Sequence, residues 1–223
     1  MNNPFRKKNG CVATLVLVLL LIPVIASYGA EKVVNKTRST VRLAVIPLQA
    51  VATKAETGNT VIGPLSGAVY FGGKIAEGGQ KVVEELLIEK LKDFKTIEII
   101  PREKVEGIYR RVGAESLKMP LPEIIKKTGA ELDADLIVAG YVFRYVERIG
   151  YDYAVEKAAS VAFEINFVNP QDGSIIWRGV FDKTQKSLME DVFHVSSLRW
   201  LTVRELTKQG MHQTLKSYSG FAD

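Results

Sequence analysis

Cysteine and histidine, the residues most used for disulfides, metal sites and nucleophilic catalysis, are scarce in this chain. Its 223 residues include one cysteine, Cys11, and two histidines, His194 and His212. Cys11 lies at the start of an N-terminal apolar run, so a chain processed beyond that run has no cysteine. Disulfides, thiolate zinc sites and cysteine nucleophiles are then excluded together. The histidines lack an E-x-x-H context, so they do not indicate a metal site.

Beyond residues 1–30, the chain also has no large excess of positive or negative charge. The formal net charge is +5, but residues 1–30 contain Arg6, Lys7 and Lys8 and no acid, which leaves 27 basic against 25 acidic residues. This balance does not favour nucleic acid as a partner. The content of 47% hydrophobic and 25% charged residues is that of a globular protein, which excludes a disordered or multi-span membrane chain.

The sequence contains no complete motif for phosphate binding or nucleophilic catalysis. The stretch from Gly67 to Ile75 approaches a phosphate-binding loop, but Gly73 stands where the lysine is required. No serine lies in a G-x-S-x-G motif. Asp133 and Asp135 are a candidate carboxylate pair, although such residues at a strand entrance are more often solvated. We therefore expect no catalytic residue, cofactor or metal ligand, and a protein that is not an enzyme.

The N-terminus has the layout of an export segment. A basic start, an apolar run from Cys11 to Ala26 and a stretch of small residues make residues 1–30 a signal peptide, with cleavage after Gly29. The alternative is an uncleaved N-terminal membrane anchor, which would bring the protein into membrane contact. Residues 31–40 are polar, without a period, and are expected to be a tether. The expected location is the periplasm or cell envelope.

The remainder, 41–223, is expected to form one α/β domain. Apolar runs and alternation predict strands, and three-to-four-residue spacing predicts helices, including a C-terminal helix over 203–217 that starts at a capping box formed by Thr202 and Glu205. The order predicts a mixed sheet of about five strands, with a crossover first half, an antiparallel meander second half and helices packed on the sheet. The predicted strands are 41–47, 96–100, 135–146, 161–168 and 175–181, and the other predicted helices are 74–94, 104–112 and 122–132.

Two details of the last hairpin bear on the core. The strand 161–168 alternates strictly, which predicts one face in the core and the other face, with Glu164 and Asn166, in water. The hairpin turns at Gly173, and Trp177 on the returning strand is expected to face inward.

Candidate partner-binding residues occur in two places. Residues 49–72 are rich in glycine and poor in large apolar residues, so we expect a long loop, of the kind that is often functional. A second place lies after Gly150, where exposed tyrosines beside charged residues suit a protein interface. The candidate residues are Val61, Ile62, Leu65, Val69, Tyr70 and Phe71 in the loop, and Tyr151 and Tyr153 beyond it.

Four segments together resemble a family of bacterial envelope proteins. They are R-L-A-V-I-P-L-Q (42–49), F-K-T-I-E-I-I-P-R-E-K-V-E-G-I (94–108), I-I-K-K-T-G-A-E-L-D-A-D-L-I-V-A-G-Y-V (124–142) and N-P-Q-D-G-S-I-I-W-R-G (169–179). They resemble the α/β unit of the superfamily that includes CsgG-type secretion lipoproteins, LpoB and the N-terminal domain of TolB. The resemblance implies a non-enzymatic part of an envelope assembly. Many such proteins are lipidated, whereas no cysteine follows the apolar run here.

Three functions are open at this point. The first is an exported accessory or scaffolding protein that binds another envelope protein or assembly, with a second copy of the chain as a possible partner. The second is a CsgG-type secretion-channel subunit, which requires membrane-crossing segments of about ten alternating residues. The third is an uncharacterised envelope enzyme.

The export assignment makes a direct prediction. Because residues 1–30 are expected to be removed, the mature protein should begin near Ala30 and fractionate outside the cytoplasm. N-terminal sequencing of the protein from fractionated cells checks this. A cytoplasmic product that retains Met1 would contradict the assignment, and an exported product that retains Met1 would select the membrane anchor.

Overall fold

A mixed sheet organises the fold. The computed structural model describes residues 40–51, 60–115, 119–151, 154–185 and 200–221, which belong to one unit of the chain, Arg38–Asp223. The strand order is β10-β9-β6-β1-β5. These strands are β1 (Val41–Val45), β5 (Ile97–Ile99), β6 (Leu136–Val146), β9 (Ser160–Val168) and β10 (Ile175–Thr184).

The sheet changes character at β6. β1 pairs parallel with both β5 and β6, whereas β9 pairs antiparallel with both β6 and β10. A two-residue strand, β2 (Gln49–Ala50), extends the parallel half by pairing with β6 beyond the end of β1. Parallel neighbours need crossover connections and antiparallel neighbours need only hairpins, which is the division expected from the sequence. The predicted fold class is therefore confirmed.

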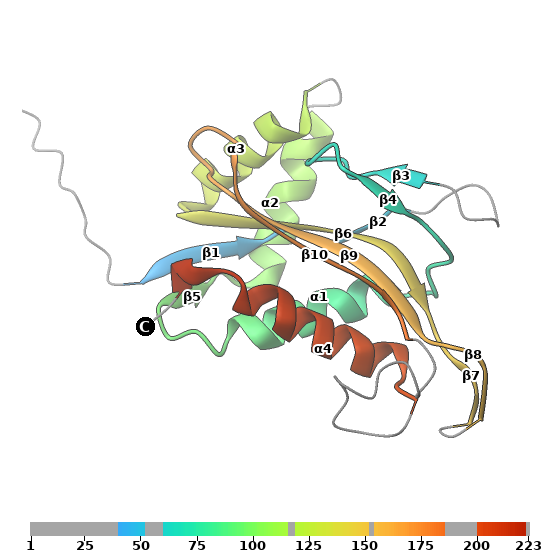
Figure 1. Cartoon of the computed structure of the whole chain (residues 1–223). Coiled ribbons are helices and arrows are strands. Elements are labelled where there is room, and N and C mark those ends of the chain that lie inside the picture. The colour runs from blue at the N-terminus through green and yellow to red at the C-terminus, as the bar shows by residue number, and fades with distance from the viewer. Residues whose placement is uncertain (1–39, 52–59, 116–118, 152–153, 186–199, 222–223) are drawn as a thin grey trace, which may run out of the picture. The chain divides into compact units, whose positions relative to one another are not determined.

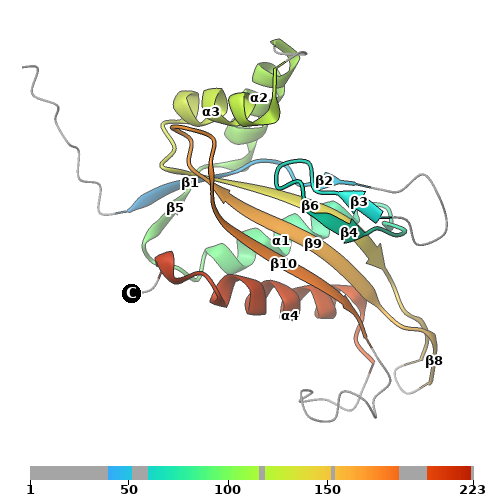
Figure 2. The ribbon, with the colours of Figure 1, turned by 45° about the horizontal axis from the view of Figure 1, so that its top comes forward.

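Helices cover both faces of this sheet (Figures 1 and 2). α1 (Gly79–Leu91) and α4 (Val203–Lys216) pack on one face, which we call the α1/α4 face. α2 (Arg102–Glu115) and α3 (Leu121–Leu132) cover one end of the opposite face. Among the described residues, no helix is both long and apolar enough to cross a bilayer.

Two small hairpins and a short helix complete the described chain. β3 (Thr60–Ile62) pairs with β4 (Val69–Phe71), and β7 (Ile149–Tyr151) pairs with β8 (Ala154–Lys157). The 3-10 helix η1 spans Ser219–Phe221. The β3–β4 hairpin lies on the same side of the sheet as α2 and α3 (Figure 2), and packs on the part of that face that the helices leave open.

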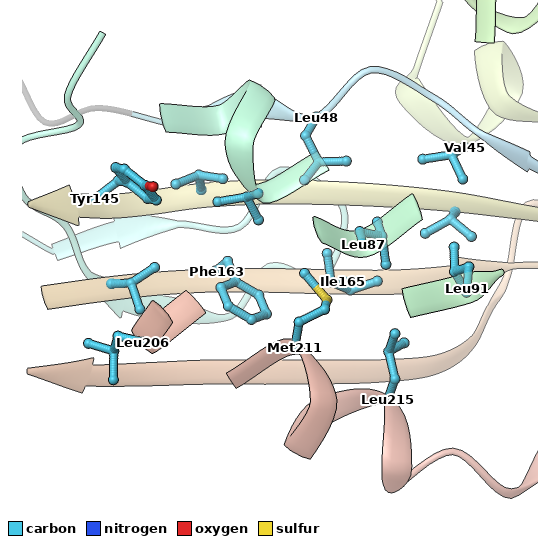
Figure 3. Packing of buried hydrophobic residues seen from close by; sticks show 14 of the residues in the cluster. Val45, Leu48, Leu87, Leu91, Tyr145, Phe163, Ile165, Leu206, Met211 and Leu215 are labelled. Atoms are coloured by element: carbon cyan, nitrogen blue, oxygen red, sulfur yellow. The ribbon is translucent and has the colours of Figure 1, made fainter. Parts of the chain in front are cut away.

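The main core lies between the sheet and the α1/α4 face. Alternate residues of β9, including Phe163 and Ile165, contact Leu87 of α1 and Met211 of α4 (Figure 3). All four side chains are buried. Burial of large apolar side chains stabilises a fold by about 1.5–3 kcal/mol each. This core therefore carries most of the stability that a chain without disulfides needs.

α4 approaches the sheet more closely than ordinary side chains allow. Its N-terminus is fixed by the expected capping box, in which Thr202 and Glu205 each bond the other's backbone N–H. About two turns from the start of the helix, a Cβ atom on Gly210 would lie 2.4 Å from the ring of Phe181 in β10. The absence of a side chain at Gly210 is therefore what lets the helix rest on β10.

The structure corrects two expectations about the other face. Residues 49–72 are not a continuous loop, because β2, β3 and β4 lie in that range. The face of β9 that carries Glu164 and Asn166 does not face water, since every residue of β9 is buried. The two corrections are connected, because the β3–β4 hairpin, which was expected to be loop, covers this face of β9 and β6.

Trp177 lies on the expected face of β10 but is only partly buried. Its ring packs against Phe167 of β9, with ring centres 4.7 Å apart, and against Tyr218, at 5.4 Å. It joins the main core from the edge of the sheet rather than from the interior.

This placement sets the expected cost of removing the ring. Trp177→Ala should lower the free energy of unfolding by about 2 kcal/mol, because part of the ring is already in water. Phe163→Ala is the matched control in the fully buried position and should cost ~3–5 kcal/mol. Urea unfolding of both variants measures the difference. A larger loss for Trp177→Ala than for Phe163→Ala would contradict the packing described.

Candidate functional site

The β3–β4 hairpin presents two different faces because its strands pair in a fixed register. Thr60 pairs with Phe71, Val61 with Tyr70, and Ile62 with Val69. Paired residues point to the same side, and successive pairs alternate. The pair of Val61 and Tyr70 therefore faces the sheet, and the two flanking pairs face away from it.

The inward face is packed on the sheet. The ring of Tyr70 stacks on Phe143 of β6, with centres 4.2 Å apart and planes 13° from parallel. Val61 and Leu65 are partly buried against the same cluster, which also contains Tyr141. Three of the six candidate residues in this segment therefore contribute to packing within the domain.

A buried carboxylate fixes the hairpin in place. Glu164, in the middle of β9, has no exposed surface. Its Oε2 atom accepts hydrogen bonds from the hydroxyls of Tyr70 and Ser66, the latter at 2.7 Å, and its Oε1 atom accepts one from Asn166 Nδ2 at 2.5 Å. A buried carboxylate is tolerated only when hydrogen bonds replace its lost water. Two of the three donors come from the hairpin segment, so covering Glu164 and docking the hairpin are one event.

The hydroxyl of Tyr70 reflects this environment. Burial is the largest cause that raises the pKa of Tyr70, followed by the hydrogen bond to Glu164, and together they bring the pKa to about 12. The nearby charge of Arg178 acts in the opposite direction. Tyr70 therefore stays protonated and keeps donating to the carboxylate throughout the physiological pH range.

The turn between β3 and β4 is shaped by two glycines. Gly63 lies against the buried cluster, where a Cβ atom would be 2.6 Å from Ser66 Oγ and 3.1 Å from Glu164 Oε2. Gly67 has a φ of +68°, a conformation that side-chain-bearing residues rarely adopt. The glycines that suggested a long loop are required for a close approach and a tight turn.

Arg144 ties the hairpin to the strands beside it. A β-bulge in β6 between Val142 and Arg144 shifts the register there. The guanidinium then donates from Nη1 to the backbone oxygen of Phe71 at 3.0 Å, from Nε to Ser160 Oγ at 2.6 Å, and from Nη2 to Asp182. One side chain thus links β4, β9 and β10.

The outward face of the hairpin is apolar and open. Ile62 is 64% exposed, and Val69 and Phe71 are each 65% exposed. Three large apolar side chains on one side of a rigid hairpin are unusual for a surface that meets only water, and clustered exposure of this kind marks interaction sites. We refer to Ile62, Val69 and Phe71 as the hairpin patch.

The second candidate surface is at the β7–β8 hairpin. Tyr151 is 83% exposed and Ile149 is 53% exposed. Tyr153 lies outside the described residues. In the part of the chain that the structure describes, Tyr151 and Ile149 are not joined to the hairpin patch by any recorded contact, so the structure provides two separate candidate surfaces.

The other carboxylates considered from the sequence are engaged in structural contacts. Asp133 accepts from Arg42 Nη1 at 2.7 Å, and Asp135 accepts from the backbone N–H of Arg42 at 2.8 Å, which joins β1 to the start of β6. Buried Glu84 accepts from the backbone N–H of Leu48 and pairs with Arg102. Within residues 40–51, 60–115, 119–151, 154–185 and 200–221, no three acidic, histidine or cysteine side chains gather to hold a metal ion.

Sequence reasoning missed the central residue of this site. Glu164 was expected in water because strict alternation in an antiparallel strand usually separates a buried from a wet face. A signal was present, since Glu164 and Asn166 stand on one face of a strand and can bond each other. What the pattern could not supply is the distant segment that covers them, because Ser66 and Tyr70 lie about a hundred residues earlier.

Comparison with known proteins gives matches among solved structures but none among family models or curated sequences. Solved structures with a similar fold include PelC from Paraburkholderia phytofirmans, described as a dodecamer, at 10% identity and a TM-score of 0.45 over 79% of this chain and 86% of PelC. The lipoprotein GNA1162 from Neisseria meningitidis matches at 14% identity and a TM-score of 0.45, over 79% of this chain and 99% of its own.

LpoB, which the sequence resemblance named, is also among these structures. The C-terminal domain of LpoB from Escherichia coli matches at 12% identity and a TM-score of 0.39, over 65% of this chain and 83% of that domain. The sequence resemblance and the comparison of structures thus both name LpoB.

The hydrogen bond between Tyr70 and Glu164 can be tested by removing one oxygen atom. Tyr70→Phe should lower the free energy of unfolding by ~1.5–3 kcal/mol, because it removes a donor from a buried carboxylate. Amide hydrogen exchange over residues 60–71 should accelerate in the same variant, since the hairpin loses an attachment to the sheet. Urea unfolding and exchange mass spectrometry measure the two effects.

A matched control is present on the neighbouring strand. The hydroxyl of Tyr141 is buried without a hydrogen-bond partner among the described residues, so Tyr141→Phe removes the same atom without breaking a bond. It should be neutral or slightly stabilising. Equal losses for the two variants would show that Glu164 does not anchor the hairpin.

Proposed function

We propose that this chain is an exported, non-enzymatic accessory protein of the bacterial cell envelope that binds another envelope protein through the hairpin patch. The observation that carries the proposal is the two-sided β3–β4 hairpin. Its inner side is held by the buried carboxylate of Glu164, and its outer side exposes Ile62, Val69 and Phe71. Export rests on the layout of residues 1–30.

The physical properties of the patch suit a protein partner. Aromatic and aliphatic side chains are enriched at the centre of protein interfaces, and Phe71 supplies a large ring with few rotatable bonds. The hairpin is already fixed by Tyr70, Ser66 and Arg144 before any partner arrives. A partner therefore binds a preformed surface and loses little free energy to ordering it.

That the chain has no enzymatic activity is part of the same proposal. The buried carboxylates of the described residues serve as internal attachments, with Glu164 holding the hairpin and Glu84 joining α1 to Leu48 and Arg102. Their hydrogen bonds are directed at neighbouring segments of the chain. This use of acidic residues supports a binding role rather than acid–base chemistry.

The experiment places a reporter in the patch and then disrupts the patch. A photo-cross-linking amino acid at Val69, introduced into the full chain in living cells, should give a covalent adduct with one envelope protein that mass spectrometry identifies. Adding Phe71→Asp should reduce the yield of that adduct at least ~10-fold, because a charged group in the centre of an apolar interface must lose its water.

Ile149→Asp is the matched control, because it places the same charge on an exposed apolar residue of the other hairpin. It should leave the adduct unchanged. Loss of the adduct with Ile149→Asp and not with Phe71→Asp would move the interface to the β7–β8 hairpin. An adduct containing only a second copy of the chain would contradict the proposed partner.

A further inference from the structure

One edge of the main sheet is long and unpaired in the described chain. β10 is the terminal strand in the order β10-β9-β6-β1-β5, and no described strand pairs with its outer side. The other terminal strand, β5, has only three residues, whereas β10 has ten. Proteins usually shorten, bend or cover such edges, because an open strand is a template for pairing with another chain. The only irregularity in β10 is at its start, between Ile175 and Trp177.

The side chains along this edge have a pattern that is complementary to itself. On the face away from α4, the successive residues of β10 are Arg178, Val180 and Asp182, opposite Asn166, Glu164 and Ala162 of β9. The sequence on that face is thus a cation, an apolar residue and an anion. An antiparallel copy of the same strand centred on Val180 places Arg178 opposite Asp182 of the second strand, twice, with Val180 opposite Val180.

Neighbouring registers lose this match. A shift of two residues places either Arg178 or Asp182 opposite Val180, and a shift of four places two arginines or two aspartates opposite each other. Like charges directly opposite are destabilising in a sheet. One register is therefore favoured over its neighbours by charge alone. Arg178 is exposed and has no recorded ion-pair partner among the described residues. Asp182 already accepts from Arg144 of its own chain through Oδ1, so in this register Arg178 of the second copy would pair with the other carboxylate oxygen, Oδ2.

The helix layer leaves room for a second copy. α4 packs over both β9 and β10, and Trp177 and Phe181 of β10 remain partly exposed on that side. Both rings therefore keep surface that the approach of another strand can cover. In the antiparallel arrangement, two α4 helices would lie side by side, and both aromatic rings would lose their remaining contact with water.

We propose that β10 pairs with β10 of a second copy of this chain, antiparallel and centred on Val180, so that two sheets become one. The hairpin patch is not part of this contact and stays available to another protein. The arrangement is a closed two-fold dimer, because each copy uses β10, the one long terminal strand of the sheet that the structure describes.

A residue on the two-fold axis gives a direct test, since a cysteine at position 180 would face its own copy. In the full chain with Cys11→Ser, Val180→Cys should form a disulfide-linked dimer under mild oxidation in the native cell fraction, or with a short bis-maleimide. Most of the protein should shift to twice its mass on a non-reducing gel. Val69→Cys is the matched control, because this valine is 65% exposed compared with 42% for Val180 but lies off the axis.

The charge pair provides a second measurement. Adding Arg178→Asp to Val180→Cys should reduce the cross-linked fraction several-fold, because two aspartates would then face each other, whereas Arg178→Lys should preserve it. Thermal unfolding confirms that each variant is folded. Absence of a dimer in folded Val180→Cys, or equal cross-linking of Val69→Cys, would overturn the proposal. Insensitivity to Arg178→Asp would also overturn the register.

Discussion

The burial of Glu164 is the constraint that determines how the face of the sheet opposite the α1/α4 face is covered. A carboxylate in the centre of a strand with no access to water must receive hydrogen bonds from the protein, and β9 itself supplies only the amide of Asn166. The remaining donors, the hydroxyls of Ser66 and Tyr70, come from the β3–β4 segment. The electrostatic requirement of one residue thus determines where a distant hairpin lies. Because the hairpin lies there, its other side is presented to partners.

The regular part of the fold could be predicted from the sequence, because its information is local. The apolar spacing in α1, the continuous apolar start of β6 and the capping box of Thr202 and Glu205 each specify an element from a few adjacent residues. The order of those elements then restricts the sheet to a parallel half and an antiparallel half. Physical rules that act over short stretches were sufficient at this level.

The candidate site was only partly predictable, because it depends on contacts between segments far apart. The segment 49–72 was selected from its composition, and its glycines suggested a long loop, whereas Gly63 and Gly67 permit a tight, packed turn. Composition does not separate these two uses of glycine. The same limit applied to Tyr70, which looked like a docking residue and is buried, whereas its neighbours Val69 and Phe71 are exposed. The two-residue period of a strand decided between them, and three-residue strands are too short to be recognised by that period.

The close contact between α4 and β10 has a consequence for how this sequence can diverge. Gly210 accommodates the ring of Phe181, and a Cβ atom on Gly179 would lie 2.3 Å from both Trp177 and Thr214. At each glycine, a side chain from another part of the fold thus occupies the space where a Cβ atom would lie. A larger residue at position 210 is compatible with this packing only when position 181 becomes smaller, so the two positions should drift together through related proteins even though 29 residues separate them along the chain.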